Sequence, residues 1–348
     1  DIFKYIKIGK INKAIKVIDS LDNTENFRGN IKYHYLKSIA YLACYENKNT
    51  ADTYDFNYLK NAFQSLMTVR QLDNTGYKKN TNELLVRLAS HFLFNGVEDF
   101  NRKQYNEALE EFENVIQINK MPEINRIDTM VYFNAAISAE KNGDTAKAIH
   151  YFETVVLMNF GGTFPIMELA DLYIAQKQYD KAINLLETAF QEYPDNKDIL
   201  NTLANIFLTI RKYTDAKPWI RKIIDIQPND TLYFTLGSIY DYEHLPDSAK
   251  INYERALVLN PKNRDALYNL GVLFYLKAIK EIKMENSSKS LSDNIKAMLE
   301  QSREYLEKSF AIDNKNIEMV KILIGISKLL DNNKLEKKYK KIFENLNK

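Results

Sequence analysis

The sequence predicts an all-α fold, a right-handed solenoid of about eight antiparallel helix pairs, from two regular spacings and one recurring residue pattern. Four alanines recur at intervals of 34, 34 and 33 residues, at Ala148, Ala182, Ala216 and Ala249. Three prolines keep intervals of 34 and 33 residues, each twelve residues beyond its alanine, at Pro194, Pro228 and Pro261. A fixed period of this size that recurs so often is typical of stacked helical repeats.

Within each period the same small and large residues recur. Leu236-Gly237 is followed by Tyr240, and Ala249 is followed four residues later by Tyr253. Residues three and four apart lie on one face of a helix, so each repeat is expected to contain two amphipathic helices. The small residues would lie where two helix axes come close, with the aromatic residue beside them. The proline would end the second helix, because it cannot continue the hydrogen-bond ladder.

This pattern resembles the tetratricopeptide repeat family, whose unit is a helix–turn–helix of about 34 residues. The resemblance is specific over residues 129–276 and looser elsewhere. The tryptophan that often opens the family's first helix is replaced here by Tyr132, Tyr233 and Leu267. The resemblance implies a single solenoid over residues 1–348, in which the first helices of successive repeats line a concave groove.

Residues 1–128 are expected to form degenerate or irregular repeats before the regular ones at 129–263. Residues 1–28 resemble the end of a repeat whose first helix is mostly missing, and the chain opens without methionine, so any signal peptide or lipid anchor is expected to precede Asp1. Gly96 and Ala108 keep the twelve-residue spacing of Gly237 and Ala249. Further helices are expected over 30–46, 54–73, 84–100 and 106–117.

Two details of the regular repeats need a local explanation. Gly161-Gly162 stands where a proline is expected, and we interpret it as a helix end and turn, because no Gly-Lys-Ser/Thr follows as a phosphate-binding loop requires. Pro218 lies within a second helix, where the first turn would tolerate it if Thr214 is the N-cap. Trp219 beside it is expected to pack rather than to stack on a ligand.

The repeat at 264–316 is interrupted. Gly271 should have its small partner twelve residues later, but the best match, Ser302, follows after 31 residues. We infer a helical insertion at 275–301 that lengthens both helices into a projecting hairpin with a polar turn at 285–290. Insertions often mark a binding face of a repeat protein, and a hairpin without a partner is the alternative.

Residues 317–348 are expected to be C-terminal capping helices, whose lysines face water. A membrane-binding or nucleic-acid-binding patch is the alternative, but Asp331, Glu336 and Glu344 interrupt the lysines.

Composition and motifs exclude several functional classes. The chain has 48 Lys and Arg against 46 Asp and Glu, a net charge of +2, so no general attraction to nucleic acid is expected. The one cysteine, Cys44, excludes an intrachain disulfide and is expected to be a buried apolar residue. No apolar run approaches the ~20 residues that span a bilayer, so no transmembrane segment is predicted.

The four histidines do not suggest a metal site, because no two lie at metal-ligand spacing on one helix. Motifs of zinc proteases, α/β-hydrolases, kinases and dinucleotide-binding proteins are not found. We therefore expect no enzyme activity, catalytic residue, metal or cofactor. The histidines are His34, His91, His150 and His244.

The family resemblance assigns groove-facing positions of the first helices, counted from the alanine of each repeat. Aromatic residues alternate there with amides and hydroxyls, which suits an extended peptide: the amides would bond its backbone and the rings would hold its side chains. The alternative for each aromatic residue is packing between repeats. The predicted groove residues are Phe94, Phe133, Asn134, Ile137, Phe164, Met167, Asp171, Asn201, Asn205, Phe234, Ser238, Tyr242, Tyr268, Asn269 and Tyr275.

A clamp for a C-terminal carboxylate, known in some members of the family, is not expected. The positions that would carry its lysines and arginines hold Leu93, Phe133, Met167, Asn201, Phe234 and Tyr268.

We therefore predict a non-enzymatic scaffold that binds a peptide or protein segment in its concave groove. The alternative is a structural subunit of a larger assembly, docking through its convex face, its ends or the 275–301 hairpin. The composition resembles that of exported proteins of bacterial cell envelopes, with a cytoplasmic location as the alternative. The sequence encodes neither the identity of the partner nor an oligomeric state.

Overall fold

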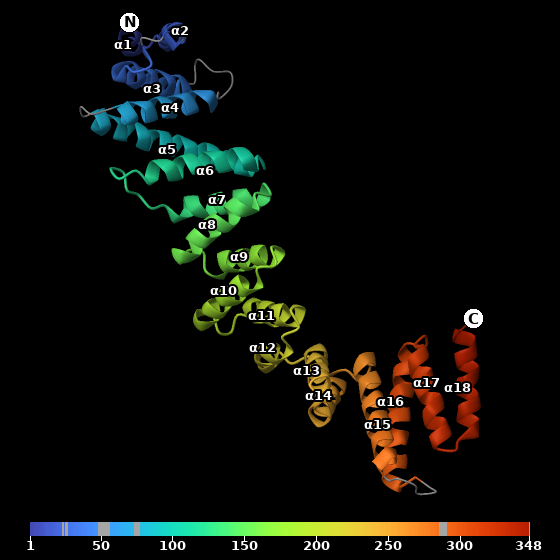
Figure 1. Ribbon diagram of the computed structural model, residues 1–348. Coiled ribbons are helices and arrows are strands. Elements are labelled where there is room, and N and C mark those ends of the chain that lie inside the picture. The colour runs from blue at the N-terminus through green and yellow to red at the C-terminus, as the bar shows by residue number, and fades with distance from the viewer. Residues whose placement is uncertain (23, 25–26, 48–55, 73–76, 285–290, 348) are drawn as a thin grey trace. The chain divides into compact units, whose positions relative to one another are not determined.

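The computed structural model describes residues 1–348 apart from 23, 25–26, 48–55, 73–76, 285–290 and 348 (Figure 1). The residues that it describes form 18 helices, so the predicted all-α helical-repeat fold is confirmed, with slightly more helices than eight pairs supply. The chain separates into two compact units, Asp1–Ala182 and Ile183–Lys348, which we call unit 1 and unit 2. None of the described helices is both long and apolar enough to cross a lipid bilayer.

Unit 1 consists of consecutive helices, most of which pack on their chain neighbours. Helix α5 begins well before the predicted residue 84, where Thr81 is buried and Arg70 of α4 donates to Asn82. The bounds are α1 (Ile2–Lys7), α2 (Ile11–Asp22), α3 (Ile31–Glu46), α4 (Phe56–Leu72), α5 (Tyr77–Asn101), α6 (Tyr105–Asn119), α7 (Thr129–Lys141), α8 (Thr145–Leu157), α9 (Thr163–Ala175) and the first turn of α10 (Tyr179–Glu192).

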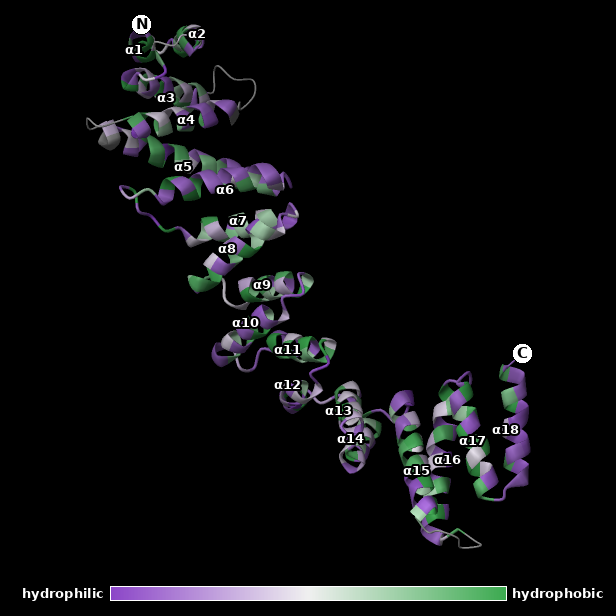
Figure 2. Ribbon diagram, in the orientation of Figure 1, coloured by the Kyte–Doolittle hydropathy of each residue, from purple (hydrophilic) through white to green (hydrophobic). Residues whose placement is uncertain are grey.

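Unit 2 contains the rest of α10 and the remaining helices. Figure 2 shows hydrophobic and hydrophilic residues interspersed along its helices, with hydrophilic residues prevailing on α18. The bounds are α11 (Lys197–Thr209), α12 (Tyr213–Ile226), α13 (Asp230–Tyr242), α14 (Pro246–Leu259), α15 (Arg264–Met284), α16 (Asp293–Ile312), α17 (Ile317–Leu329) and α18 (Asn333–Leu346).

Small residues lie where the two helices of a repeat touch, as the pattern predicted. A Cβ added at Gly237 would lie 2.7 Å from the ring of Tyr253, and one added at Gly96 would lie 2.8 Å from the ring of Phe112. Both rings are buried. The α5–α6 and α13–α14 pairs therefore each have a contact that leaves no room for a side chain at the glycine.

Asparagines begin many of the helices. Their side chains accept hydrogen bonds from backbone N–H groups of the first turn, which otherwise have no partner within the helix. These N-cap residues are Asn30, Asn196, Asn229, Asn316 and Asn332.

The turn after α8 agrees with its interpretation as a helix end. Asn159, Gly161 and Gly162 have φ angles of 49°, 83° and 63°, in the left-handed region that glycine tolerates.

The expectation for Pro218 is wrong. Helix α12 begins at Tyr213 with Lys212 as its N-cap residue, directly after the left-handed Arg211, so Pro218 is past the first turn. Its missing N–H therefore removes a bond to the carbonyl of Thr214. Trp219 packs edge-on against Phe190 with ring centroids 5.1 Å apart, in agreement with a packing role.

The lengthened hairpin near the C-terminus is confirmed. Helices α15 and α16 have 21 and 20 residues, and the predicted polar turn at 285–290 lies outside the described residues. The Ser302 hydroxyl donates to the Gly271 carbonyl over 2.6 Å, so Ser302 is the small partner of Gly271 despite the longer spacing.

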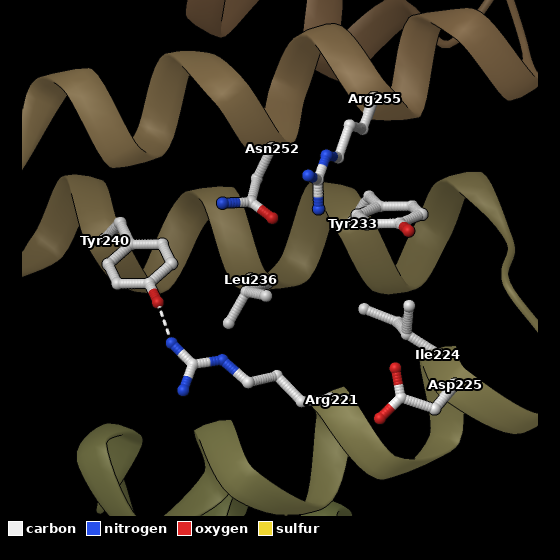
Figure 3. Close-up of a pocket in the computed structure, with 8 residues that line it drawn as sticks. All are labelled: Arg221, Ile224, Asp225, Tyr233, Leu236, Tyr240, Asn252 and Arg255. Carbon is white, nitrogen blue, oxygen red and sulfur yellow. Dashed lines mark hydrogen bonds between the residues drawn. The ribbon is translucent and has the colours of Figure 1, made fainter.

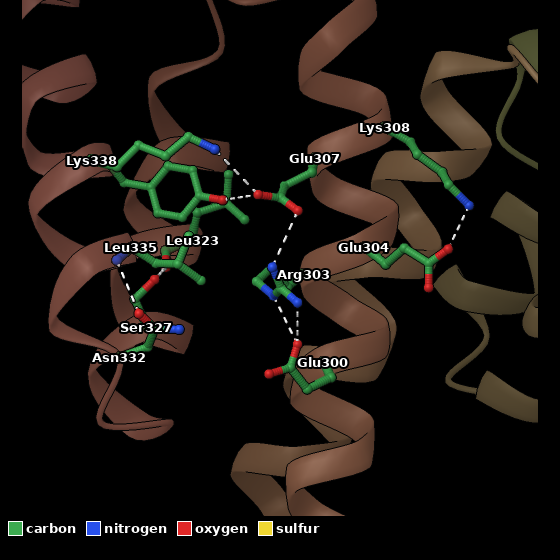
Figure 4. Close-up of polar contacts among 11 residues, drawn as sticks. Glu300, Arg303, Glu304, Glu307, Lys308, Leu323, Ser327, Asn332, Leu335 and Lys338 are labelled. Atoms are coloured by element: carbon green, nitrogen blue, oxygen red, sulfur yellow. Dashed lines mark hydrogen bonds and ion pairs between the residues drawn. The ribbon is translucent and has the colours of Figure 1, made fainter.

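A polar network joins the last helices (Figure 4). The hydroxyl of the buried Tyr339 donates to Glu307, whose carboxylate also lies 3.5 Å from Lys338 and from Arg303. Arg303 bonds Glu300 over 2.8 Å through Nε. Part of the charged face of the C-terminal helices therefore stabilises the contact between α18 and α16.

Candidate functional site

In unit 1, three predicted groove residues are aromatic, and two of them, Phe133 and Phe164, are in contact. The ring of Phe133 on α7 lies edge-on to that of Phe164 on α9, with centroids 5.9 Å apart, and edge-on to Phe160 at 5.8 Å. Phe164 is 48% exposed, and Phe94 on α5 is 60% exposed. Ring contacts thus hold Phe133 and Phe164, while Phe164 and Phe94 leave apolar surface open to a ligand.

Helices α7 and α9, which carry Phe133 and Phe164, also carry acidic residues further along the helix face that bears the ring. On α7 the residues four and seven after Phe133 are Ile137 and Glu140; on α9 the residues four and seven after Phe164 are Glu168 and Asp171. Side chains at this spacing share one helix face. We call these six residues the α7–α9 face. Asn134 and Met167, also predicted, are half-buried beside it.

The acidic part of the α7–α9 face is poorly neutralised. Burial raises the pKa of Glu168, and the carboxylates of Glu140 and Asp171 raise it further, while Lys141 acts in the opposite direction. Lys141 lies 3.6 Å from Glu140. The α7–α9 face therefore has an aromatic end and an electronegative end.

In unit 2, only part of the predicted set is open to solvent. Asn201 and Asn205 are exposed on α11, and Tyr242 is exposed at the end of α13, with its ring 4.7 Å from that of Tyr213. These residues remain available to a partner.

Two predicted polar residues of unit 2 are bonded within the fold. The hydroxyl of the buried Tyr253 donates to Ser238 Oγ over 3.4 Å and accepts from Asn269 Nδ2 over 3.0 Å. This use of the amide competes with the predicted bond to a peptide backbone.

Three predicted aromatic residues of unit 2 also contribute to its packing. Phe234, Tyr268 and Tyr275 are partly buried against the core of unit 2. Tyr275 Oη would lie 3.2 Å from a Cβ added at Gly325 on α17. Packing between repeats, the alternative considered for these rings, therefore accounts for much of their surface.

Sequence reasoning missed a polar pocket between α12, α13 and α14, with a volume of about 340 Å³ (Figure 3). Arg221 donates to the hydroxyl of Tyr240, and the guanidinium of Arg255 lies 5.7 Å from the centroid of Tyr233. The lining residues come from three helices and do not occupy groove positions, so no single-helix pattern marks them. The lining is Arg221, Ile224, Asp225, Tyr233, Leu236, Tyr240, Asn252 and Arg255.

A buried carboxyl group in unit 1 was also missed. Glu111 on α6 is fully buried, and neither carboxyl oxygen has a hydrogen-bond partner among the described residues. Burial raises its pKa to about 9; the nearby Asn95 side chain acts in the opposite direction, while Asp99 and Glu110 add to the increase. Glu111 is therefore protonated at neutral pH. Among the described residues no group of three His, Cys, Asp or Glu is placed to hold a metal ion.

Comparisons with known proteins identify the repeats. Two tetratricopeptide repeat models match residues 173–238 and 231–263. The BBSome complex member BBS4 homolog of Drosophila melanogaster is 28% identical over 115 residues, which cover 32% of this chain and 23% of that protein. The RNA polymerase-associated protein CTR9 of Saccharomyces cerevisiae is 26% identical over 216 residues, or 55% of this chain and 20% of that protein. The chain thus spans about a fifth of the length of these relatives.

Among solved structures, a crystal structure of MamA protein superimposes with a TM-score of 0.43 and 19% identity. The superposition covers 53% of this chain and 91% of that one.

Proposed function

Because the chain is a tetratricopeptide repeat protein, whose repeats support a role as a protein–protein interaction scaffold, we propose that it binds an extended segment of a partner protein without catalysing a reaction. The binding surface in unit 1 is the α7–α9 face, with the exposed Phe94 on α5 as a further contact for the partner. In unit 2 the exposed Asn201, Asn205 and Tyr242 supply a second candidate surface.

The exposed rings of unit 1 are the observation that carries this proposal. Phe164 and Phe94 leave 48% and 60% of their surface in water, although a large apolar side chain gains about 1.5–3 kcal/mol on full burial. Edge-on contact with Phe133 holds Phe164 in place before a ligand arrives. A ring that is already ordered loses little side-chain entropy on binding, so most of its contact energy contributes to affinity.

The names of two relatives agree with a scaffold role. One is a BBSome complex member and the other an RNA polymerase-associated protein, so both belong to or associate with larger assemblies. Tetratricopeptide repeats in the present chain are proposed to serve the same general purpose, with a partner of its own.

The test uses peptides selected on the full-length chain from a display library, with Kd measured by calorimetry. Phe164→Ala and Phe94→Ala should each weaken a selected peptide about tenfold, since each removes part of an aromatic contact surface. Leu157→Ala is the matched control, because Leu157 is 86% exposed at the end of the second helix α8. Equal affinities for wild type and both phenylalanine variants would overturn the proposal.

A second candidate role is docking into an assembly through the α15–α16 hairpin. Leu276 and Met284 on α15 are 59% and 68% exposed, more than packing within the repeat requires. Leu276→Ser/Met284→Ser should then abolish capture of an assembly partner while leaving the affinity for selected peptides unchanged. If Phe164→Ala instead abolished capture of the assembly partner, the α7–α9 face would be the docking surface.

A further inference from the structure

The α7–α9 face has a charge pattern that specifies its ligand more closely than the repeats do. The pattern has three parts, which are an aromatic end, an acidic end and the polarity of the two helices that carry them. The inference drawn from it rests on the proposed function, since it names the class of peptide that the same face selects.

The two ends of the face are separated along the helix axes. Seven residues separate Phe164 from Asp171, and seven separate Phe133 from Glu140. At ~1.5 Å of rise per residue, each ring lies about 10 Å from the acid of its helix. An extended peptide advances ~3.3 Å per residue, so about three residues span that distance.

The acidic end has few internal partners. Neither Glu168 nor Asp171 forms an ion pair or a side-chain hydrogen bond with another residue in the described part of the chain, and Glu140 faces only Lys141, at 3.6 Å. Burial raises the pKa of Glu168, and repulsion from the carboxylates of Glu140 and Asp171 raises it further. A cation placed between the three carboxylates would offset their repulsion. It would also give each carboxylate a favourable charge–charge contact.

Helix polarity acts in the same direction. Glu140 is in the last turn of α7, which ends at Lys141, and Asp171 lies four residues before Ala175, the end of α9. The C-terminal end of a helix carries partial negative charge from its free carbonyl groups. Glu140 thus adds to a potential that is already negative, and Asp171 lies toward the same end of its helix, whereas the aromatic end lies toward the helix N-termini.

We propose that the α7–α9 face selects a cationic peptide segment, with a lysine or arginine within about three residues of an aromatic or large aliphatic side chain. The apolar side chain packs against Phe133 and Phe164, and the cation lies among Glu140, Glu168 and Asp171. An acidic segment would be repelled by these three carboxylates.

The test is a selection of random short peptides, displayed on phage, by three forms of the full-length chain. These are wild type, Glu168→Gln/Asp171→Asn, and a control, Glu107→Gln/Asp180→Asn, which removes the same charge from the first turns of α6 and α10. Circular dichroism should show equal helicity for all three. Wild type and control should retain peptides enriched in lysine and arginine near apolar residues, and Glu168→Gln/Asp171→Asn should lose that enrichment.

One selected peptide then gives the magnitude. Its affinity should fall about fivefold in Glu168→Gln/Asp171→Asn and no more than twofold in the control, with the difference shrinking at high salt. Peptides retained with no preference for cations, or with the same preference in all three forms, would overturn the inference and leave the proposed function standing. Retention of no peptide that depends on Phe164 would instead overturn the proposed function.

Discussion

The close packing of the repeat helices can be measured at Gly271, where α15 meets α16. A Cβ added there would lie 2.5 Å from Leu306 Cγ, 2.7 Å from its Cδ2 and 3.2 Å from the Ser302 carbonyl oxygen. Leu306 is fully buried and cannot swing into solvent. Alanine is favoured over glycine in a helix by about 1 kcal/mol, but forcing a methyl group into a packed core costs about 1–3 kcal/mol. Gly271→Ala should therefore lower the free energy of unfolding by up to about 2 kcal/mol.

The matched control is Gly325→Ala on α17, where the added Cβ would lie 3.2 Å from Tyr275 Oη, the far end of a side chain. This variant should be neutral or stabilised by up to about 1 kcal/mol. Leu306→Ala alone should cost about 2–5 kcal/mol, and Gly271→Ala/Leu306→Ala should cost less than the sum, because the new methyl group enters the space that leucine leaves. Urea unfolding followed by circular dichroism measures all four. A Gly271→Ala variant as stable as Gly325→Ala, or strictly additive costs, would refute the reasoning.

Further predictions concern polar groups inside the fold. The folded chain keeps the proton of Glu111 up to pH of about 9, whereas the unfolded chain loses it near its ordinary pKa, so this group lowers stability as pH rises between the two values. Glu111→Gln should remove that pH dependence, and Tm curves parallel to wild type from about pH 5 to 9 would contradict this. Tyr339→Phe removes the bond to Glu307 and should lower the free energy of unfolding by about 1–2 kcal/mol in urea titrations; an unchanged midpoint would show that water replaces the bond. Asn269→Ala removes the 3.0 Å bond to the buried Tyr253 and should cost about 1 kcal/mol, and a loss of peptide affinity without any loss of stability would show that its amide serves a ligand instead.

Much of the fold follows from the sequence because the repeat contact restricts residue size. A glycine such as Gly237 is required where the ring of Tyr253 touches the opposite helix, so the spacing of small and large residues carries three-dimensional information. The same pairing of small residues predicted the lengthened hairpin. Ser302 bonds the Gly271 carbonyl even though the insertion separates the two residues by 31 positions.

The spacing of small and large residues does not predict features that several helices form together. Glu111 sits among polar residues of α6 and looks like part of a solvated face, yet α5 and α6 together bury it completely. Pro218 was misplaced because the start of α12 depends on the left-handed Arg211 before it. The polar pocket joins residues from α12, α13 and α14 that no single helix pattern relates.

The candidate site was predictable to a similar degree. Repeat positions identified Phe133, Phe164 and Asp171, because the same positions recur on each first helix. They could not show which rings stay exposed: Tyr275 packs against α17, whereas Phe164 leaves about half its surface open. Neighbouring helices decide that difference.

The central claim is that the α7–α9 face holds a peptide segment of a partner. A crystal structure of the full chain with a library-selected peptide tests it most directly. We predict peptide side chains packed on Phe133 and Phe164, with a lysine or arginine facing Glu168 and Asp171. A peptide bound to the second helices or to the α15–α16 hairpin, with the α7–α9 face empty, would contradict the account.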